Sequence, residues 1–252
     1  MSDDIILETR ELTREFKGFV AVNNVNLKVK RGHIHALIGP NGAGKTTFVN
    51  MLTGALAPTS GRILMNGQEI TNANQAARVR LGLGRTFQIT TLFRRLPVLD
   101  NVALAVAERR GDAQRMWHPA SFHKEIMDES KNLLATFGLA DDAGAAAQDL
   151  PYGKQRLLEI AIALGLKPKV LLLDEPAAGV PSADTEKILQ HLEKLSAEIA
   201  ILIIEHDMDL VFRFAQRITV LVQGQVLVEG APGEIAADRR VRDVYLGEAT
   251  HA

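Results

Sequence analysis

The sequence predicts an α/β fold, in which a mostly parallel sheet carries helices on its faces and is joined to an antiparallel β subdomain and a helical insertion. Three observations support this prediction. Towards the C-terminus, segments of helical and of strand pattern alternate along the chain. The N-terminal part contains segments typical of short strands, separated by turns. From about residue 74 to residue 148 the chain is alanine-rich, and its apolar residues recur at helical spacing.

The N-terminal elements are predicted first. The segments ILETRELTREF and VNNVNLKVKRGHIHALIG are typical of strands, with a turn at Arg31 and Gly32. TTFVNMLTGAL predicts a helix that ends near Gly54. GRILMNGQEI predicts a hairpin whose turn is formed by Asn66 and Gly67, because this dipeptide favours the tight turn between antiparallel strands.

The alternating part follows the helical block. Its expected helices and strands, in chain order, are helix 154–164, strand 170–173, helix 184–198, strand 200–204, helix 207–215 and strand 218–222. Because a helix separates each pair of strands, these strands are expected to run parallel in one sheet.

We predict a single domain for the whole chain, divided into three regions. The α/β core takes in residues 1–87 and 165–230, the helical subdomain residues 88–164, and a C-terminal tail residues 231–252. No internal repeat or low-complexity linker suggests a second domain.

Composition narrows the function classes. Hydrophobic residues make up 46% of the 252 residues, which is enough for a sizeable core. The net charge of −1 argues against nucleic acid as the main partner, since phosphate backbones select basic surfaces. The absence of cysteine excludes disulfides, zinc thiolates and cysteine nucleophiles. No segment is long and apolar enough for a signal peptide or a membrane span, so any membrane link is expected to go through a partner.

A glycine-rich loop follows the apolar segment HIHALI and precedes a helix, which is the setting of a phosphate-binding loop. Glycines let backbone N–H groups close on phosphate oxygens, and the helix N-terminus adds positive potential. We expect Lys45 to reach the β- and γ-phosphates, Thr46 to hold Mg²⁺ and Thr47 to contact the α-phosphate. The alternative is a glycine turn that contains Lys-Thr by chance. The expected nucleotide-binding residues are Gly39, Pro40, Asn41, Gly42, Ala43, Gly44, Lys45, Thr46 and Thr47.

Two carboxylates end the apolar segment VLLL. Ligands of open α/β sheets bind at the carboxyl ends of the strands, so Asp174 is expected to hold Mg²⁺ through water and Glu175 to polarise the attacking water. His206 follows another strand end, and Gln88 lies between the core and the helical block. Solvated acids, a surface histidine and a surface glutamine are the alternative interpretations.

The order of these features resembles the nucleotide-binding subunit of ATP-binding cassette (ABC) transporters. The resemblance covers nearly the whole chain and implies a P-loop NTPase (RecA-like) core that binds ATP and Mg²⁺. It makes residues 39–47 the Walker A loop, Asp174 and Glu175 the Walker B acids, and residues 150–154 the signature motif. It also implies catalytic roles for Lys45, Gln88, Glu175 and His206, a metal contact for Gln88, and adenine stacking by Phe16.

Finer features resemble the branched-chain (hydrophobic) amino acid importer ATPases. These are the segments TFQITTLFRRLPVLDNV, LPYGKQRLLEIA, LDEPAAGV, IIEHDMDLV and VYLGEA. The resemblance implies an ATPase at the cytoplasmic face of the membrane, with permease subunits, a second ABC ATPase subunit and, indirectly, a substrate-binding protein as partners. A soluble ABC ATPase with an assembly or regulatory role and a P-loop kinase are the alternatives.

The signature motif departs from the usual Leu-Ser-Gly-Gly-Gln. In the family it faces the nucleotide of the opposite subunit, so Gly153 and Lys154 are expected to act in trans. Pro151 stands at the serine position and Tyr152 at the first glycine, while Pro181 stands where an acid or asparagine is usual. We therefore hypothesise that the chain pairs with a different ATPase subunit whose signature retains serine. The alternative is that the serine is dispensable.

Overall fold

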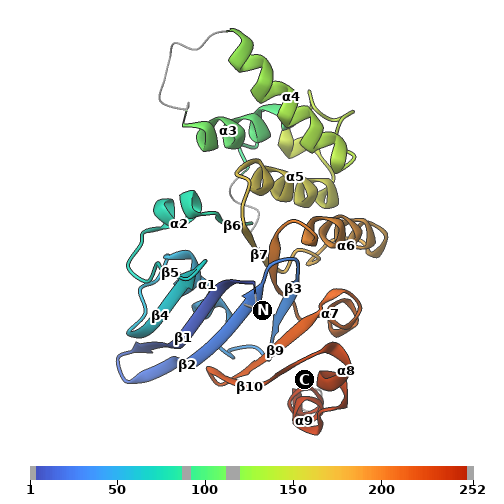
Figure 1. Cartoon of the computed structure of the whole chain (residues 1–252). Coiled ribbons are helices and arrows are strands. Elements are labelled where there is room, and N and C mark those ends of the chain that lie inside the picture. The colour runs from blue at the N-terminus through green and yellow to red at the C-terminus, as the bar shows by residue number, and fades with distance from the viewer. Residues whose placement is uncertain (1–3, 87–91, 112–119, 249–252) are drawn as a thin grey trace.

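The computed structural model describes residues 4–86, 92–111 and 120–248, and its strands form two sheets within those ranges (Figure 1). One sheet has the strand order β2-β1-β4-β5 and is antiparallel throughout. The other has the order β10-β9-β3-β8-β7-β6, and all its pairs are parallel except β9 with β10. This confirms the predicted α/β core and antiparallel subdomain.

The antiparallel sheet contains β1 (Ile5–Phe16), β2 (Phe19–Lys30), β4 (Ser60–Met65) and β5 (Gln68–Glu69). The predicted hairpin turn joins β4 to β5, with positive φ at both Asn66 and Gly67 (48° and 75°). Two left-handed residues are what a type I′ turn requires, so the dipeptide explains the hairpin.

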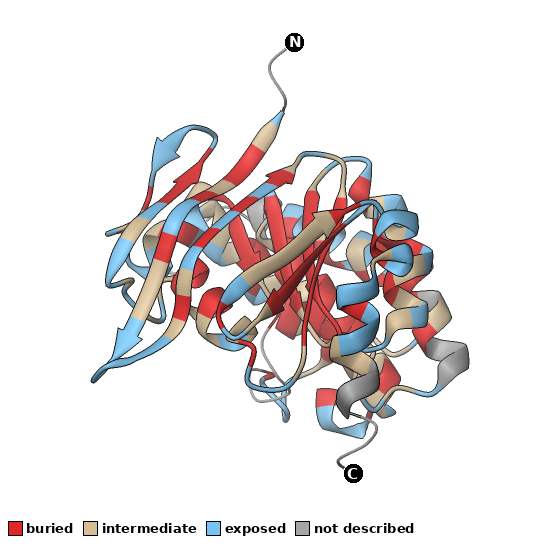
Figure 2. Cartoon of the chain, turned by 90° about the horizontal axis from the view of Figure 1, so that it is seen from below, coloured by how far each residue is buried: buried red, intermediate tan, exposed pale blue. Residues whose placement is uncertain are grey.

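The larger sheet contains β3 (Ile34–Ile38), β6 (Leu83–Arg85), β7 (Val170–Asp174), β8 (Ala200–Ile204), β9 (Arg217–Val222) and β10 (Gln225–Gly230). Every residue of β3 and β8 is buried, and β7 becomes accessible only at Asp174. Figure 2 shows these buried strands in the middle of the molecule. Continuous apolar strands suit a parallel sheet covered on both faces.

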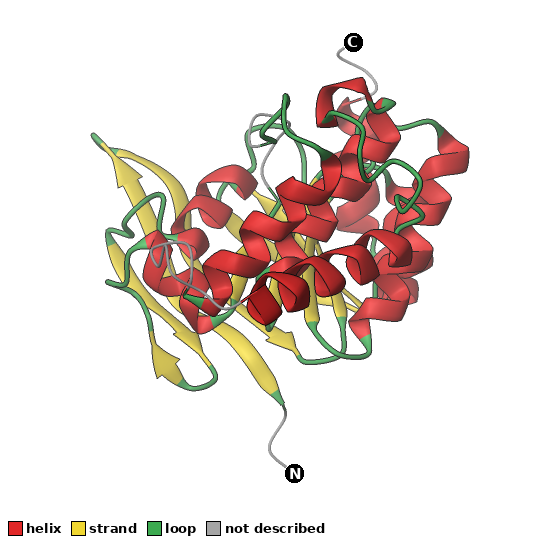
Figure 3. Cartoon of the chain, turned by 90° about the horizontal axis from the view of Figure 1, so that it is seen from above, coloured by secondary structure: helices red, strands yellow, loops and turns green. Residues whose placement is uncertain are grey.

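The helices cover this sheet and extend beyond it. They are α1 (Lys45–Thr53), α2 (Gln75–Leu81), α3 (Val98–Arg110), α4 (Ala120–Thr136), α5 (Tyr152–Gly165), α6 (Ser182–Ser196), α7 (Met208–Phe214), α8 (Pro232–Ala237) and α9 (Arg239–Glu248), with a short 3₁₀ helix η1 (Ala147–Asp149). Helices α3, α4 and α5 pack on one another away from the antiparallel sheet (Figure 1). Seen from above, helices lie in front of the parallel strands, and other strands project at one side (Figure 3). Within the described ranges, no helix has the length and apolar character needed to cross a membrane.

Three features of the fold differ from the sequence expectation. Strand β6 lies inside the block predicted to be mostly helical. It was not predicted because three residues are too few to show a strand pattern. Strand β10 was not predicted; it follows a turn with positive φ at Gln223 and Gly224 (48° and 78°) and pairs with β9. Helices α8 and α9 occupy the region expected only as a tail. The boundaries of the three predicted regions stay a prediction.

Candidate nucleotide-binding site

The glycine-rich loop joins the carboxyl end of β3 to the start of α1, as predicted. Gly39, Gly42 and Gly44 have φ values of 152°, 76° and 97°. A β-carbon at Gly39 would run into the carbonyl oxygen of Leu221, and one at Gly44 into that of Ala21. Glycine is therefore required at both positions, because the backbone is left-handed and a neighbouring strand lies directly against it.

The first turn of α1 is open to an anion. It contains no acidic residue, and no side chain caps its N-terminus. The Lys45 ammonium folds back over the loop and donates to the carbonyl oxygens of Gly39 (2.5 Å) and Pro40 (2.9 Å). Thr46 is exposed and Thr47 is half-buried. A helix N-terminus and a nearby ammonium together make a phosphate cradle.

Asp174 ends β7 and is held by an arginine that sequence reasoning missed. Arg85, at the end of β6, donates Nη2–H to Asp174 Oδ2 (2.9 Å) and Nη1–H to Asn50 Oδ1 on α1 (2.9 Å). The side chains of Arg85 and Asp174 are 15% and 14% exposed. The pair therefore joins the helix after the glycine loop to the two strands that bring Asp174 into the site.

Glu175 follows in a left-handed conformation with φ of 46°, which is uncommon for a residue with a side chain. Its N–H donates to the carbonyl oxygen of Ile204 on β8 (2.9 Å), and its own carbonyl oxygen accepts from Ala178 N–H (3.1 Å). Its side chain is 40% exposed. Strain at such a position is typical of functional sites, and here it turns the chain at the end of the strand.

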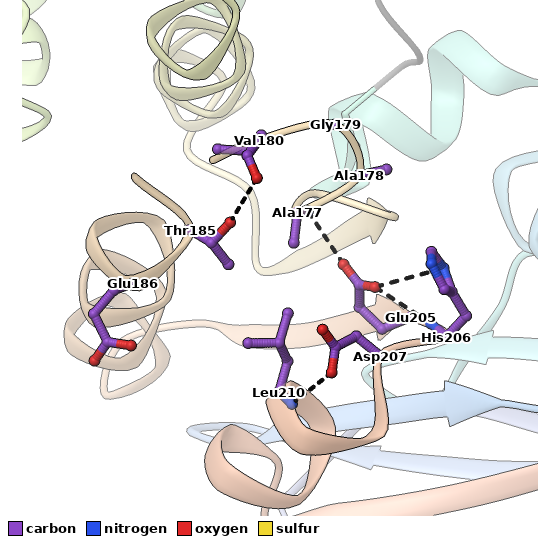
Figure 4. Close-up of a pocket in the computed structure, with 10 residues that line it drawn as sticks. All are labelled: Ala177, Ala178, Gly179, Val180, Thr185, Glu186, Glu205, His206, Asp207 and Leu210. Atoms are coloured by element: carbon purple, nitrogen blue, oxygen red, sulfur yellow. Dashed lines mark hydrogen bonds and ion pairs between the residues drawn. The ribbon is translucent and has the colours of Figure 1, made fainter. Parts of the chain in front are cut away.

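His206 lies beside Glu175, as the strand-end argument predicted. Its Nδ1 is 3.7 Å from Glu175 Oε1 and 3.9 Å from Glu205 Oε2. Glu205 is a second site residue that the sequence did not predict, and it is only 2% exposed. It lines a hollow of about 360 Å³ together with His206 and Asp207 (Figure 4). Burial raises the pKa of the Glu205 carboxyl, against bonds from two backbone N–H groups that lower it.

The signature segment lies at the start of α5. Pro151 is exposed at the N-cap without a side-chain hydrogen bond, and Gly153 is buried. Lys154 Nζ donates to Asp142 Oδ2 of its own chain (2.6 Å). The lysine expected to supply charge in trans is thus paired within the chain in this structure. The roles of Gly153 and Lys154 towards an opposite nucleotide stay a prediction.

The tyrosine of the signature segment contacts the turn after Glu175. A β-carbon at Gly179 would lie 3.3 Å from Tyr152 Cε1, and φ at Gly179 is +70°. The Arg156 guanidinium also lies over this ring, with its Cζ 5.6 Å from the Tyr152 ring centroid. The ring that replaces the usual glycine therefore packs between α5 and this turn.

Phe16 and Gln88 are the two other predicted site residues. Phe16 ends β1, is 40% exposed, and carries the Arg14 guanidinium 4.5 Å from its ring centroid. Gln88 lies outside the described residues. Adenine stacking by Phe16 and the nucleotide, catalytic and metal roles of Gln88 stay predictions.

The donor set fits Mg²⁺ bound together with a nucleotide. The described part of the chain contains no cluster of three or more His, Cys, Asp or Glu side chains that could hold a metal alone. Thr46 and Asp174 offer a hydroxyl and a carboxylate, and Mg²⁺ prefers few protein oxygens with phosphates and water as its other ligands.

Comparison with known proteins decides the family. The family model described as ABC transporter matches residues 22–178, from β2 through the glycine loop and α5 to the turn after Glu175. The chain belongs to the ABC transporter family. A second model, described as branched-chain amino acid ATP-binding cassette transporter, matches residues 225–251 of this ABC subunit, which include β10, α8 and α9.

The ABC subunit is similar to curated relatives over almost its full length. It is 40% identical to the high-affinity branched-chain amino acid transport ATP-binding protein BraF of Pseudomonas aeruginosa, covering 97% of this chain and 98% of the relative. It is also 40% identical to the high-affinity branched-chain amino acid transport ATP-binding protein LivG of Escherichia coli, covering 97% of this chain and 98% of that protein.

Solved structures give the same fold. An ATP-binding cassette of an ABC transporter in its ADP conformation matches with a TM-score of 0.86 and 30% identity, covering 96% of this chain and 99% of that one. A dimeric post-hydrolysis cassette bound to ADP and phosphate matches with a TM-score of 0.76 and 26% identity, covering 90% and 99%. The ABC subunit is thus a nucleotide-binding ATPase of a transporter. A regulatory ABC ATPase and a P-loop kinase, the alternatives from the sequence, are not favoured.

Proposed function

We propose that this chain hydrolyses ATP at the cytoplasmic face of the cell membrane to power the import of branched-chain or other hydrophobic amino acids. The observation that carries the proposal is the near full-length similarity to two branched-chain amino acid transport ATP-binding proteins, at 40% identity. The match of residues 225–251 to a model of the same transporter group supports it from a separate part of the chain.

ATP binding uses the loop and its neighbours. Residues 39–47 surround the phosphates with N–H groups, and the Lys45 ammonium leaves the loop carbonyls to bind the β- and γ-phosphates. Phe16 stacks on adenine. Thr46, Asp174 and Gln88 would hold Mg²⁺, which would neutralise negative charge on the nucleotide phosphates.

Hydrolysis uses the groups at the ends of β7 and β8. Glu175 is accessible enough to accept a hydrogen bond from a water and orient it towards the γ-phosphate. His206 lies next to Glu175, with its Nδ1 directed at that carboxylate. Its other ring nitrogen is then free to contact the γ-phosphate, where negative charge must be stabilised in the transition state.

The active form is a dimer in which each signature segment closes on the partner's nucleotide. The first-turn N–H groups of α5 have no partner inside the helix, so they are suited to a phosphate. Pro151 provides no hydroxyl, and we propose that the partner is a second, different ABC ATPase subunit with serine at this position. Its signature would then serve the site built on residues 39–47 and Glu175 of this chain.

This arrangement predicts the effect of restoring the serine. In the assembled transporter, Pro151→Ser should raise ATP hydrolysis at the site that this signature serves by about tenfold to a hundredfold, since one hydrogen bond to a charged group contributes on the order of 1.5–3 kcal/mol. Phosphate release is measured alongside Pro151→Ala, which removes the proline ring without adding a hydroxyl. Equal rates for the serine and alanine variants, or no gain over the wild type, would refute the missing-hydroxyl explanation.

Coupling to transport requires permease subunits, which in turn meet a substrate-binding protein. Phe93, just after the Gln88 segment, is 59% exposed, whereas Leu92 is 8% exposed and packs inside. Of the two, Phe93 is therefore the candidate contact with a permease. Phe87, another apolar residue of this segment, lies outside the described residues.

The experiment that tests the proposed function is copurification. The tagged chain is expressed in its native cell, the membranes are solubilised gently, and bound proteins are identified by mass spectrometry. Polytopic membrane proteins and a second ABC ATPase should be recovered. Recovery from the soluble fraction alone, without membrane partners, would contradict a transport role and favour a regulatory one.

A further inference from the structure

Glu205 is a buried acid for which the mechanism above has no use. It directly follows β8, whose residues are all apolar, and its exposed fraction is 2%. Placing a carboxylate away from water costs free energy unless the group is well bonded. An acid in this position therefore calls for an explanation beyond packing.

Its two oxygens bind two backbone groups on different segments. Oε1 accepts from the N–H of Ala177 (3.1 Å), 28 positions away in the chain, and Oε2 accepts from the N–H of His206 (3.3 Å). Oε2 also lies 3.9 Å from His206 Nδ1. Figure 4 shows the carboxylate between the turn of Ala177 and the histidine.

Ala177 belongs to the turn that begins at Glu175. Within this turn Glu175 O accepts from Ala178 N–H (3.1 Å), and Ala177 O accepts from Val180 N–H (3.1 Å). A rigid group that holds Ala177 therefore also limits the movement of Glu175. Because Glu205 holds His206 at the same time, it joins the two segments that carry the catalytic carboxylate and the histidine.

We propose that Glu205 is a positioning residue whose carboxylate fixes His206 relative to the Glu175 turn and so sets the geometry of ATP hydrolysis. The proposal deepens the proposed function and rests on it, since it assumes that Glu175 and His206 act on ATP. The hydrogen bonds of Glu205 go to Ala177 and His206, which lie outside the glycine loop, so nucleotide affinity should not depend on it.

The raised pKa of Glu205 argues against a role in stabilising the fold. Burial is the largest influence on Glu205 and raises its pKa, so the folded state favours the protonated acid. At pH values above that raised pKa, ionised Glu205 lowers the free energy of unfolding instead of adding to it. A neutral, equally sized glutamine removes this cost while losing one acceptor. Glu205→Gln should therefore fold as well as the wild type.

The test compares Glu205→Gln and Glu205→Ala in the complex copurified with the tagged chain. We expect kcat for ATP hydrolysis to fall on the order of tenfold in the glutamine variant and further in the alanine variant, since small misplacements of catalytic groups are costly. The dissociation constant of a fluorescent ATP analogue should stay within twofold of the wild-type value, and the melting temperature of Glu205→Gln should be unchanged.

Glu159→Gln is the matched control. Glu159 is another buried acid, with its side chain 4% exposed and its pKa raised chiefly by burial, but its carboxylate is bonded to Arg156 within α5. If loss of any buried carboxylate impaired the enzyme, this variant would behave like Glu205→Gln. We expect its kcat per folded molecule to equal that of the wild type.

The pH dependence provides a second readout. Below its raised pKa, the wild-type carboxyl is protonated and resembles the amide of Glu205→Gln. The ratio of wild-type to variant kcat should therefore fall towards one as the pH is lowered, and be largest at alkaline pH. The charged groups around Glu205 are His206, Glu175, and, on the rim of the same hollow, Asp207 and Glu186. They are present in both proteins, which differ only at position 205.

The outcomes distinguish this inference from the function on which it rests. A wild-type complex that hydrolyses ATP, with Glu205→Gln at equal kcat, would overturn the positioning role alone. A loss of kcat matched by equal losses of ATP affinity or melting temperature would also overturn it, since the residue would then be structural. A wild-type complex that neither binds nor hydrolyses ATP would overturn both.

Discussion

Replacing Glu175 with glutamine is expected to slow ATP hydrolysis at the site built on residues 39–47 by about a thousandfold while leaving ATP binding intact. The amide keeps the size of the side chain but is a far weaker acceptor for a water proton, and positioned acid–base groups contribute roughly 10²–10⁴-fold. Two cassettes that bind ATP and do not hydrolyse it should stay closed around the nucleotide. Phosphate release and size-exclusion chromatography with ATP measure the two effects.

Glu186→Gln is the control for this variant. Glu186 lines the same hollow as His206, but its carboxylate is occupied by Arg213 (2.6 and 2.9 Å). Its replacement should leave hydrolysis unchanged. The account is contradicted if Glu175→Gln retains hydrolysis, or if it stays monomeric with ATP in the presence of its partner subunit. A kinase would give no ATP-trapped dimer.

Replacing Lys45 with methionine is expected to weaken ATP binding by about a hundredfold. The ammonium is already placed over the glycine loop by its bonds to the carbonyl oxygens of Gly39 and Pro40. Charge-assisted bonds to phosphate contribute about 1.5–3 kcal/mol, which corresponds to one to two orders of magnitude in affinity. Titration with a fluorescent ATP analogue measures the loss.

Lys167→Met controls for the removal of a lysine charge. Lys167 pairs with Glu129 and its side chain is 68% exposed, so ATP affinity should not change. Far-UV circular dichroism shows whether Lys45→Met keeps its fold, since the variant also loses two bonds within the loop. A folded Lys45→Met protein with wild-type affinity for the analogue would show that the loop is not the phosphate site.

The sequence predicts the parts of the fold that carry a strong local pattern. Strand β8 has the predicted bounds and lies within a run of six apolar residues, 199–204, between Glu198 and Glu205. The loop at residues 39–44 is predicted by the spacing of its glycines between a strand and a helix, and the structure shows that Gly39 and Gly44 are required by backbone conformation and close packing. Strand β6 has three residues and becomes a strand only through its pairing with β7, which no local pattern records.

The same limit applies to the site. The carboxylates at the end of β7 and the histidine after β8 were predicted because parallel strands present their carboxyl ends at one edge. Arg85 and Glu205 were not predicted because a charged residue at the end of a strand is usually interpreted as a solvent-exposed surface residue. Their roles depend on which strands are neighbours: Arg85 lies opposite Leu172, and Asp174 opposite Ile204. The pairing of Lys154 with Asp142 likewise depends on tertiary structure.

The central claim is that ATP hydrolysis at this site drives amino acid import. Its most direct test is uptake of radiolabelled leucine, isoleucine and valine into proteoliposomes that contain the complex copurified with the tagged chain and the substrate-binding protein of the same system. The account predicts uptake that requires ATP and disappears with Glu175→Gln. A complex that hydrolyses ATP without taking up any of the three, or that takes them up equally well with Glu175→Gln, would contradict it.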